Sequence, residues 1–143
     1  MSVEQNKELA RRFYEEVGNG QNPAVANELF TADHKYHDPA SPGVPDGPAG
    51  IANLFAAYYT AYSGAHWDVE EIIATEDTVV TRWIGSGTHT APLMGIPPTN
   101  RKARVSGISV QRVRNGKISE TWNNWDALGM LQQIGVVPEL AAK

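Results

Sequence analysis

The sequence contains no cysteine among its 143 residues. Disulfide frameworks, thiolate zinc sites and cysteine nucleophiles are therefore all excluded. Positive charge is also scarce, because 12 Lys and Arg residues stand against 16 Asp and Glu residues, giving a formal net charge of -4. Proteins that bind nucleic acid or an anionic membrane surface present clustered positive charge. The densest basic group here is the short run at residues 101–104, so the composition argues against both kinds of partner.

Long apolar runs and several familiar catalytic motifs are missing as well. No stretch of about 18 apolar residues is present, and residues 1–8 are too polar for a signal peptide. Gly85-Ser86-Gly87 lacks the third glycine and the βαβ context of a dinucleotide site. Walker A, His-Glu-x-x-His and Gly-x-Ser-x-Gly motifs are absent too. We expect a cytoplasmic protein with a single domain over residues 1–143.

Helical patterns occupy the first half of the chain. Leu9, Phe13 and Val17 recur at helical spacing before the breaker Gly18-Asn19-Gly20. A short second helix is predicted to begin after Asn22-Pro23, where an N-cap residue precedes a first-turn proline. A third helix is predicted over about residues 48–62, where apolar side chains form a wide face.

After Gly64 the pattern changes to the alternation of strands. Strands are predicted over 67–73, 78–87, 103–114 and 117–125, and Asn115-Gly116 is a strong signal for a type I′ hairpin. A proline-rich loop spans 91–101, and a last helical turn or two is expected near 128–134. Helices followed by an antiparallel meander predict an α+β fold, in which three helices lie inside the curve of a twisted sheet that forms a half-barrel. Such a sheet leaves an apolar pocket at its open end.

Histidines are the first candidates for chemistry. His34 and His37 are flanked by aspartates and could bind a metal if this stretch were helical. The alternation around them and the following Pro39 favour a strand, which sends the two rings to opposite faces, so no metal site is predicted. His37 is then either a hydrogen-bonding residue at the pocket edge or part of a capped loop. His89 is either an exposed loop residue or a titratable group at the pocket mouth.

The hairpin carries a second candidate, Asp126. Centring the hairpin on Asn115-Gly116 pairs Val113 with Ile118, Gln111 with Glu120 and Ser109 with Trp122. Without a bulge, one face of the last strand would present Ile118, Glu120, Trp122, Asn124 and Asp126. The other face would present Thr121, Asn123 and Trp125. Two interpretations of Asp126 remain open. It could cap the following helix, or it could face an apolar cavity with a raised pKa and shuttle a proton.

Aromatic residues are numerous for so small a domain. By default they form the core, but they also suit a pocket for a flat, ring-containing ligand. The residues concerned are Tyr58, Tyr59, Tyr62, Trp67, Trp83, Trp122 and Trp125.

From about Asn6 to Gly135 the sequence resembles the SnoaL-like polyketide cyclases, a branch of the NTF2-like superfamily. The resemblance is carried by Tyr36-His37-Asp38-Pro39, Gly50-Ile51, Gly87-Thr88-His89-Thr90 and the segments 94–99, 112–118, 120–126 and 133–135. It implies a cone-shaped α+β barrel around a deep apolar cavity, usually in a homodimer or homotetramer. The sequence departs from the family pattern at residues 62–65 and at Ala91 and Asn100, which bears on substrate shape.

The resemblance also implies a chemistry. Members, also called ester cyclases, close a ring of a polyketide ester by intramolecular aldol condensation without a metal or another cofactor. The family's acid/base aspartate falls on Asp126, and His37 and His89 match cavity positions that could donate hydrogen bonds to carbonyl oxygens. The resemblance also implies pocket-wall and orienting roles for Tyr59, Trp122 and Asn124. From the aromatic set, Trp67 and Trp83 are expected to bind substrate as well.

We therefore expect a cofactor-free enzyme that acts by proton transfer on a hydrophobic carbonyl compound. Two alternatives remain open, because one fold hosts many functions. The first is a non-catalytic protein that binds a hydrophobic small molecule. The second is an isomerase, hydrolase or dehydratase built on the same fold.

Overall fold

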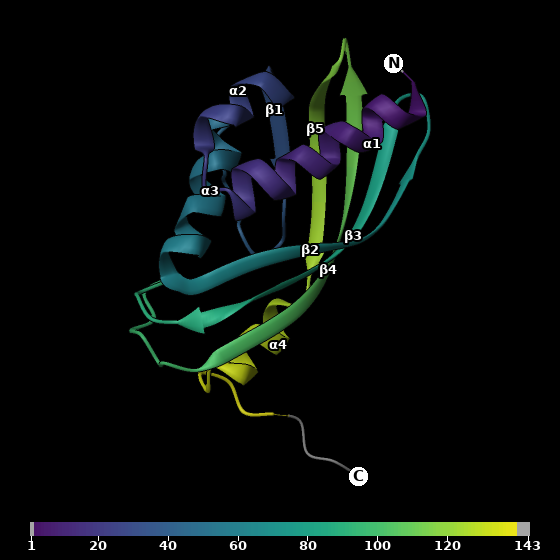
Figure 1. The fold of residues 1–143 in the computed structure, drawn as a ribbon. Coiled ribbons are helices and arrows are strands. Elements are labelled where there is room, and N and C mark those ends of the chain that lie inside the picture. The colour runs from purple at the N-terminus through teal and green to yellow at the C-terminus, as the bar shows by residue number, and fades with distance from the viewer. Residues whose placement is uncertain (1, 140–143) are drawn as a thin grey trace.

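The protein folds into a single curved sheet with helices on one of its faces (Figure 1). The computed structural model describes residues 2–139. The strands are β1 (Phe30–His37), β2 (Tyr62–Ala74), β3 (Thr78–His89), β4 (Lys102–Arg114) and β5 (Lys117–Trp125). They lie in the order β1-β5-β4-β3-β2. The predicted α+β class is confirmed.

Four of the strands form the predicted antiparallel meander, from β2 through β3 and β4 to β5. The fifth differs, because β1 pairs with β5 in parallel. β1 follows directly after the short helix that precedes it. It lies beside β5, whose residues are almost 90 positions further along the sequence. Local periodicity predicts that a segment is extended, but it carries no information about so distant a partner. The predicted all-antiparallel sheet was therefore wrong at this edge.

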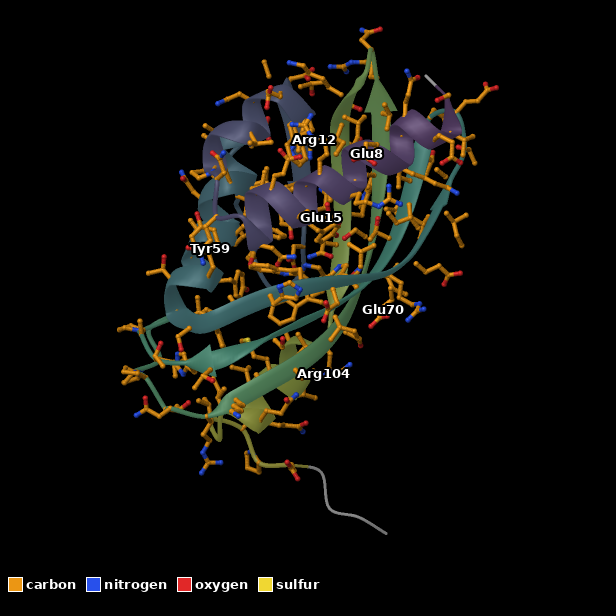
Figure 2. The ribbon with its side chains drawn as sticks, viewed as in Figure 1. Glu8, Arg12, Glu15, Tyr59, Glu70 and Arg104 are labelled. Carbon is orange, nitrogen blue, oxygen red and sulfur yellow. The ribbon has the colours of Figure 1, made fainter. Side chains whose placement is uncertain are left out.

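The helices follow the predicted order. They are α1 (Val3–Arg12), α2 (Ala26–Leu29), α3 (Pro48–Ala61) and α4 (Ala127–Gln133). Ser2 caps α1 in a capping box with Gln5, and charged side chains such as Glu8 and Arg12 point outward from it (Figure 2). The helix continues as a π-helical segment over Phe13–Asn19, which the sequence pattern did not reveal. None of the described helices is long and apolar enough to cross a membrane.

The main core lies between the helices and the inner face of the sheet. Phe13 packs edge-on against Phe30, with ring centroids 5.2 Å apart, and against Phe55 at 4.6 Å. Phe55 in turn stacks on Trp67 of β2 at 4.9 Å. The π-helical segment and α3 are thus joined to the sheet by one continuous group of aromatic rings, which dominates the buried apolar area.

A bulge at Ser119 sets which side chains of β5 face the helices. The observed pairs are Val113–Ile118, Arg112–Glu120, Gln111–Thr121 and Ser109–Asn123, with the register shift after the first pair. The predicted pairing of Val113 with Ile118 is confirmed, whereas the pairs expected for Gln111 and Ser109 were wrong by one residue. Because side chains alternate along a strand, one extra residue moves every following side chain to the other face.

Candidate functional site

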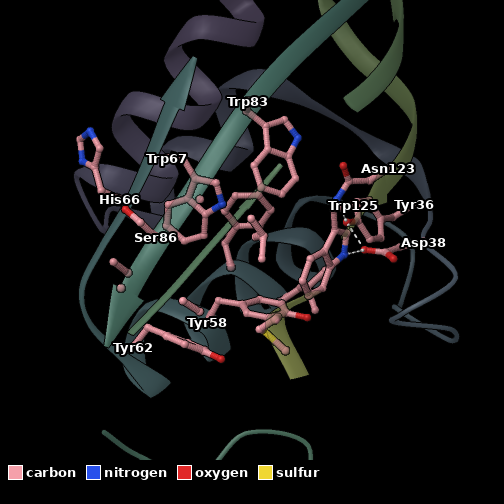
Figure 3. Close-up of a pocket in the computed structure, with 18 residues that line it drawn as sticks. Tyr36, Asp38, Tyr58, Tyr62, His66, Trp67, Trp83, Ser86, Asn123 and Trp125 are labelled. Atoms are coloured by element: carbon pink, nitrogen blue, oxygen red, sulfur yellow. Dashed lines mark hydrogen bonds between the residues drawn. The ribbon is translucent and has the colours of Figure 1, made fainter. Parts of the chain in front are cut away.

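A pocket lies between α3, the inner face of the sheet and α4 (Figure 3). The cavity itself has a volume of about 70 Å³, and the empty space rises to about 600 Å³ when the open mouth is counted. Most of its lining is apolar: Leu54, Phe55, Ala65, Trp67, Trp83, Val105, Ala103, Trp125 and Met130, together with Gly85 and Gly87. The polar lining consists of Tyr36, Asp38, Tyr58, Tyr62, His66, Ser86 and Asn123.

Two of the predicted binding residues, Trp67 and Trp83, form part of the pocket wall. Both indoles are largely buried, with 8% and 4% of their surface exposed. Gly85 lies close to both rings, and a side chain at this position would meet them. These flat faces provide stacking area for a ring-containing ligand. The structure brings both residues into the pocket, and their contact with a ligand stays a prediction.

Asp38 is the one carboxylate in the lining of this pocket among the described residues. It is 8% exposed. Its Oδ2 accepts hydrogen bonds from the Tyr36 hydroxyl at 2.8 Å and from the Trp125 indole N–H at 3.2 Å, and its Oδ1 accepts one from the Ala40 N–H at 2.8 Å. A carboxylate offers about four acceptor positions, so about one remains for a group from outside the protein.

Tyr58 and Tyr62 place hydroxyl groups on the same pocket. Both hydroxyl oxygens are buried and have no hydrogen-bond partner among the described residues. Burial raises the pKa of each to about 12. For Tyr58 the Ser41 side chain, which lies near the hydroxyl without making a hydrogen bond of good geometry, opposes the increase. Both phenols therefore carry their proton at neutral pH and can donate a hydrogen bond. An unpartnered buried donor is costly, and a ligand oxygen would satisfy it.

The mouth of the pocket carries His66 and Ser86, which lie together at one end of the lining (Figure 3). The His66 side chain is exposed, and its Nε2 lies 3.1 Å from Asp68. Neither residue was a site candidate from the sequence. His66 belongs to no motif, and Ser86 stands only in the rejected Gly85-Ser86-Gly87 pattern.

Asp126 lies outside the pocket. Its side chain is exposed and accepts a hydrogen bond from the Gly129 N–H at 2.8 Å, so it caps α4. The capping interpretation is thus confirmed, and the expected position facing the cavity is corrected. The physical reason is that β5 ends at Trp125 and the chain turns there, which directs the Asp126 carboxylate back to the helix N-terminus. The proposed catalytic role of Asp126 stays a prediction.

Three other predicted site residues lie on the outer face of the sheet. His37 is exposed, with its Nε2 2.6 Å from Glu120, and its ring stacks on Trp122. Asn124 is exposed as well. The bulge at Ser119 turns Trp122 and Asn124 outward, and strand alternation does the same for His37 while His34 is buried. As predicted, the two histidines thus occupy opposite faces. None of the three outward residues lines the pocket.

His89 and Tyr59 do not line the pocket. His89 is fully buried, so the exposed-loop interpretation was wrong. Its Nδ1 accepts hydrogen bonds from the Thr99 N–H at 3.3 Å and hydroxyl at 3.1 Å, which anchors the proline-rich loop, and its ring packs behind Tyr62 at 5.2 Å. Tyr59 lies on α3 toward the outside of the molecule (Figure 2).

Sequence reasoning missed three polar residues of the pocket lining: Asp38, Tyr36 and Asn123. Asp38 and Tyr36 stood in a quoted motif, Tyr36-His37-Asp38-Pro39, but Asp38 was interpreted as a loop residue. Asn123 was assigned to the opposite face because the bulge was not foreseen. Among residues 2–139, no group of three His, Asp or Glu side chains is arranged to hold a metal ion.

Comparison with known proteins places this geometry in a family. The family model described as SnoaL-like polyketide cyclase matches residues 8–134. A search of curated protein sequences returns no match. IdmH of Streptomyces antibioticus, a candidate polyketide cyclase, is 30% identical and superposes with a TM-score of 0.77 over 91% of this chain and 98% of its own.

Two further structures share the fold. TsrD of Streptomyces laurentii has a TM-score of 0.84 at 21% identity, covering 96% of this chain and 99% of its own. A candidate SnoaL-like polyketide cyclase of Jannaschia sp. CCS1 has a TM-score of 0.83 at 22% identity, with 95% of each chain covered. At these identities the two superpositions establish the fold alone.

Proposed function

The chain belongs to the SnoaL-like polyketide cyclase family, and we propose that it closes a ring in a hydrophobic carbonyl compound by proton transfer. The reaction would be an intramolecular aldol-type condensation, as expected from the resemblance. One observation carries this proposal. A buried carboxylate, Asp38, shares an apolar pocket with the two unpartnered hydroxyl groups of Tyr58 and Tyr62.

Asp38 is the proposed acid/base. Its free acceptor position would take a proton from the carbon next to a carbonyl group, and the resulting enolate carbon would attack a second carbonyl carbon of the same molecule. A carbon–carbon bond then forms, and the electron pair of the attacked C=O moves to its oxygen. The protonated Asp38 returns the proton to that alkoxide, so the carboxylate is restored at the end of the cycle.

Tyr58 and Tyr62 are the proposed donors to the developing oxyanion. Negative charge accumulates on the carbonyl oxygen of the enolate and then on the alkoxide, and preformed donors in a site with little water stabilise such charge strongly. Because burial raises the pKa of both phenols to about 12, they donate hydrogen bonds over the neutral pH range. Mutagenesis of single donors of this kind typically costs about 10²–10³ in rate.

The aromatic wall supports the proposed substrate class. Trp67, Trp83 and Trp125 surround the pocket with flat apolar surface, which suits a ring system and excludes water. Exclusion of water strengthens the hydrogen bonds to the reacting oxygen. The scarcity of cationic lining residues favours a neutral ligand, since no Lys or Arg lines the pocket in the part of the chain that the structure describes.

A second candidate is binding without turnover. Asp38 already accepts three hydrogen bonds from the protein, so most of its acceptor positions are occupied. A carboxylate of this kind could serve to hold Tyr36 and Trp125 in the wall of a binding pocket. The same hydrophobic ring compound would then be bound and released unchanged.

The deciding experiment compares turnover by the wild type, Asp38→Asn and Asp126→Asn, side by side in EDTA, on β-keto esters of polyketide type and on small ketones and epoxides. We expect Asp38→Asn to lose about 10²–10⁴ in rate while Asp126→Asn keeps it. Loss in Asp126→Asn alone would return the acid/base role to Asp126. Binding with no conversion by any of the three proteins would favour the binding protein. Circular dichroism of each variant shows whether the fold is kept.

The proposal includes assembly into a homodimer or homotetramer through the outer face of the sheet. A row of side chains crosses all five strands there, and its members are direct register partners: Ile73, Val80, Val110, Trp122 and His37. Ile73 is 57% exposed, and Ile108 beside this row is 51% exposed. An apolar strip on the outside of a sheet is typical of a protein interface.

A further inference from the structure

A chain of buried hydrogen bonds leads from the π-helical segment to the pocket carboxylate. The Tyr14 hydroxyl lies 2.6 Å from the Ser109 hydroxyl, and the Ser109 hydroxyl donates to Asn123 Oδ1 at 2.9 Å. The Asn123 amide N–H donates to the Tyr36 hydroxyl oxygen at 3.0 Å. Tyr36 donates to Asp38 at 2.8 Å. Tyr14 and Ser109 do not line the pocket.

The charge of Asp38 fixes the direction of every bond in this chain. An ionised carboxylate can only accept, so the single proton of Tyr36 points to Asp38 and the Tyr36 oxygen must accept from Asn123. The Asn123 amide therefore presents its N–H₂ to Tyr36 and its oxygen to Ser109. Because this oxygen also can only accept, the Ser109 proton points to it.

The other contacts of Ser109 agree with this direction. The Trp83 indole N–H can only donate, and it lies 3.3 Å from the Ser109 oxygen. The Ser109 proton is already used on Asn123, so Tyr14 must be the donor in the 2.6 Å contact. Ser109 thus accepts twice, donates once and has no remaining capacity. It is the branching point between the pocket wall and the route to the carboxylate.

We propose that Ser109 and Tyr14 are positioning residues for Asp38, which act by holding the Asn123 amide and the Tyr36 hydroxyl in the orientation in which Tyr36 donates its hydrogen bond to the carboxylate. All five side chains are at most 9% exposed, so water does not readily replace a lost member. The kinetic importance of this arrangement rests on the proposed function, whereas the effect on the ionisation of Asp38 does not.

Few other groups compete for control of Asp38. The groups that face it are Tyr36 from β1, Tyr58 from α3, and Trp125 and Asn123 from β5. No Lys, Arg or His forms an ion pair with Asp38 among residues 2–139. Stabilisation of the charge therefore depends on hydrogen bonds, and two of the three donors to Asp38, Tyr36 and Trp125, are side chains.

The test is a ¹³C NMR titration of the Asp38 carboxyl group, assigned with Asp38→Asn. Ser109→Ala removes the donor to Asn123, and we expect the pKa of Asp38 to rise by about 0.5 units or more, since linked hydrogen bonds strengthen one another. Tyr36→Phe removes the direct donor and should raise it by at least as much. Ser109→Thr retains the hydroxyl and should restore the wild-type value.

Thr81→Val provides a matched control. Thr81 is the register partner of Ser109 on β3, is fully buried, and its hydroxyl has no partner among the described residues. The substitution removes a buried hydroxyl next to the chain without breaking it, so the pKa of Asp38 should not change. An Asp38 pKa that is unchanged in Ser109→Ala, or that shifts equally in Thr81→Val, would overturn the proposal.

The titration separates this inference from the proposed function, because it requires no substrate. A shifted Asp38 pKa in a protein that converts no compound would support the positioning role and count against catalysis. If Ser109→Ala does not fold, Tyr14→Phe replaces it, since it removes only the hydroxyl at the end of the chain. A smaller rise in the pKa of Asp38 is then expected in Tyr14→Phe. If the pKa of Asp38 does not change in Tyr14→Phe, or does not change in Tyr36→Phe, the result would count against the proposed chain of hydrogen bonds.

Discussion

His37 and Trp122 stack on the outer face of the sheet, with ring centroids 5.3 Å apart and an angle of 22° between their planes. The Arg112 guanidinium lies 5.5 Å from the centre of the same indole, and Glu120 contacts the His37 ring at 2.6 Å. These four side chains form a connected surface group on the side of the sheet away from the pocket. Their arrangement favours contact with another protein surface over contact with the pocket ligand.

Val110→Glu is expected to disrupt the proposed homodimer. Val110 lies between Val80 and Trp122 in the row that crosses the outer face, so a carboxylate there would lose water on association without gaining a partner. Sedimentation velocity should find a smaller species for this variant at concentrations where the wild type is dimeric. Asn22→Glu, an exposed change away from the sheet, should sediment like the wild type. A monomeric wild type, or an unaltered Val110→Glu, would contradict the assembly.

Much of the fold could be predicted from local patterns. Helical spacing located the first and third helices, and the Asn115-Gly116 turn fixed the last hairpin, because both of these residues adopt positive φ angles. The partner of β1 could not be predicted, since it depends on packing between distant segments. The π-helical segment at Phe13–Asn19 was not expected either. Its residue types are those of an ordinary amphipathic helix. It differs from one in its hydrogen bonds, which join residues five positions apart and not four.

The candidate site was predicted less well, for two identifiable reasons. Trp67 and Trp83 were assigned to the pocket because large aromatic residues on strands are normally buried. Trp122 and Asn124 were assigned to it as well, but one bulge at Ser119 reversed the faces of β5. Asp126 could equally have been a helix cap or a pocket carboxylate, and the geometry of a single chain turn selected the cap.

Asp126→Ala should destabilise the protein without lowering turnover. The substitution removes the acceptor for the Gly129 N–H at the start of α4, and loss of such a cap typically costs about 1 kcal/mol. Urea unfolding would measure this loss. Asp126→Ser, which also caps helices well, should recover most of the stability. Turnover that falls about 100-fold in both variants would instead support the acid/base role implied by the family resemblance.

His34 should make the fold less stable at acid pH. Burial lowers the pKa of its imidazole to about 4, below the ordinary value near 6.5, so the unfolded chain binds this proton at a higher pH than the folded chain. The contribution to stability is fully present above pH 6.5 and is lost as the pH falls toward 4, by about 3 kcal/mol at most. The wild type should therefore lose more unfolding free energy between pH 7 and pH 4 than His34→Gln.

The control for His34 is His66→Gln, because His66 is exposed at the pocket mouth. Carboxylates contribute to acid unfolding in all three proteins, so the difference between the curves isolates each histidine. His66→Gln should follow the wild type closely. If the unfolding free energies of His34→Gln and the wild type change in parallel with pH, the buried imidazole does not act in this way.

Gly107→Ala should displace the Trp83 indole and narrow the pocket. A β-carbon at residue 107 would clash with the six-membered ring of Trp83, and overpacking of a core typically costs about 1–3 kcal/mol. Tryptophan fluorescence should shift and ligand affinity should fall. Ser106→Ala, the neighbouring change on the opposite and exposed face, should affect neither. Unchanged fluorescence in Gly107→Ala would mean that the Trp83 ring is not held against this position.

Asn123→Asp tests the same chain of hydrogen bonds from its centre. Asparagine both accepts from Ser109 and donates to Tyr36, whereas an ionised aspartate can only accept. Tyr36 would then have one proton to share between two carboxylates, at residues 123 and 38. Like charges so close together cannot both stay ionised, so one of the pair should titrate well above the ordinary range for aspartate.

The expected result for Asn123→Asp is a protein that is destabilised at pH 7 and recovers stability as the pH falls, because protonation removes the repulsion and restores a donor. The wild type should lose stability over the same range, so the two unfolding curves should change in opposite directions with pH. Asn123→Ala removes the amide without adding charge and should be destabilised without the recovery. If Asn123→Asp is as stable as the wild type at pH 7, the amide is not the donor to Tyr36 that the hydrogen-bond directions require.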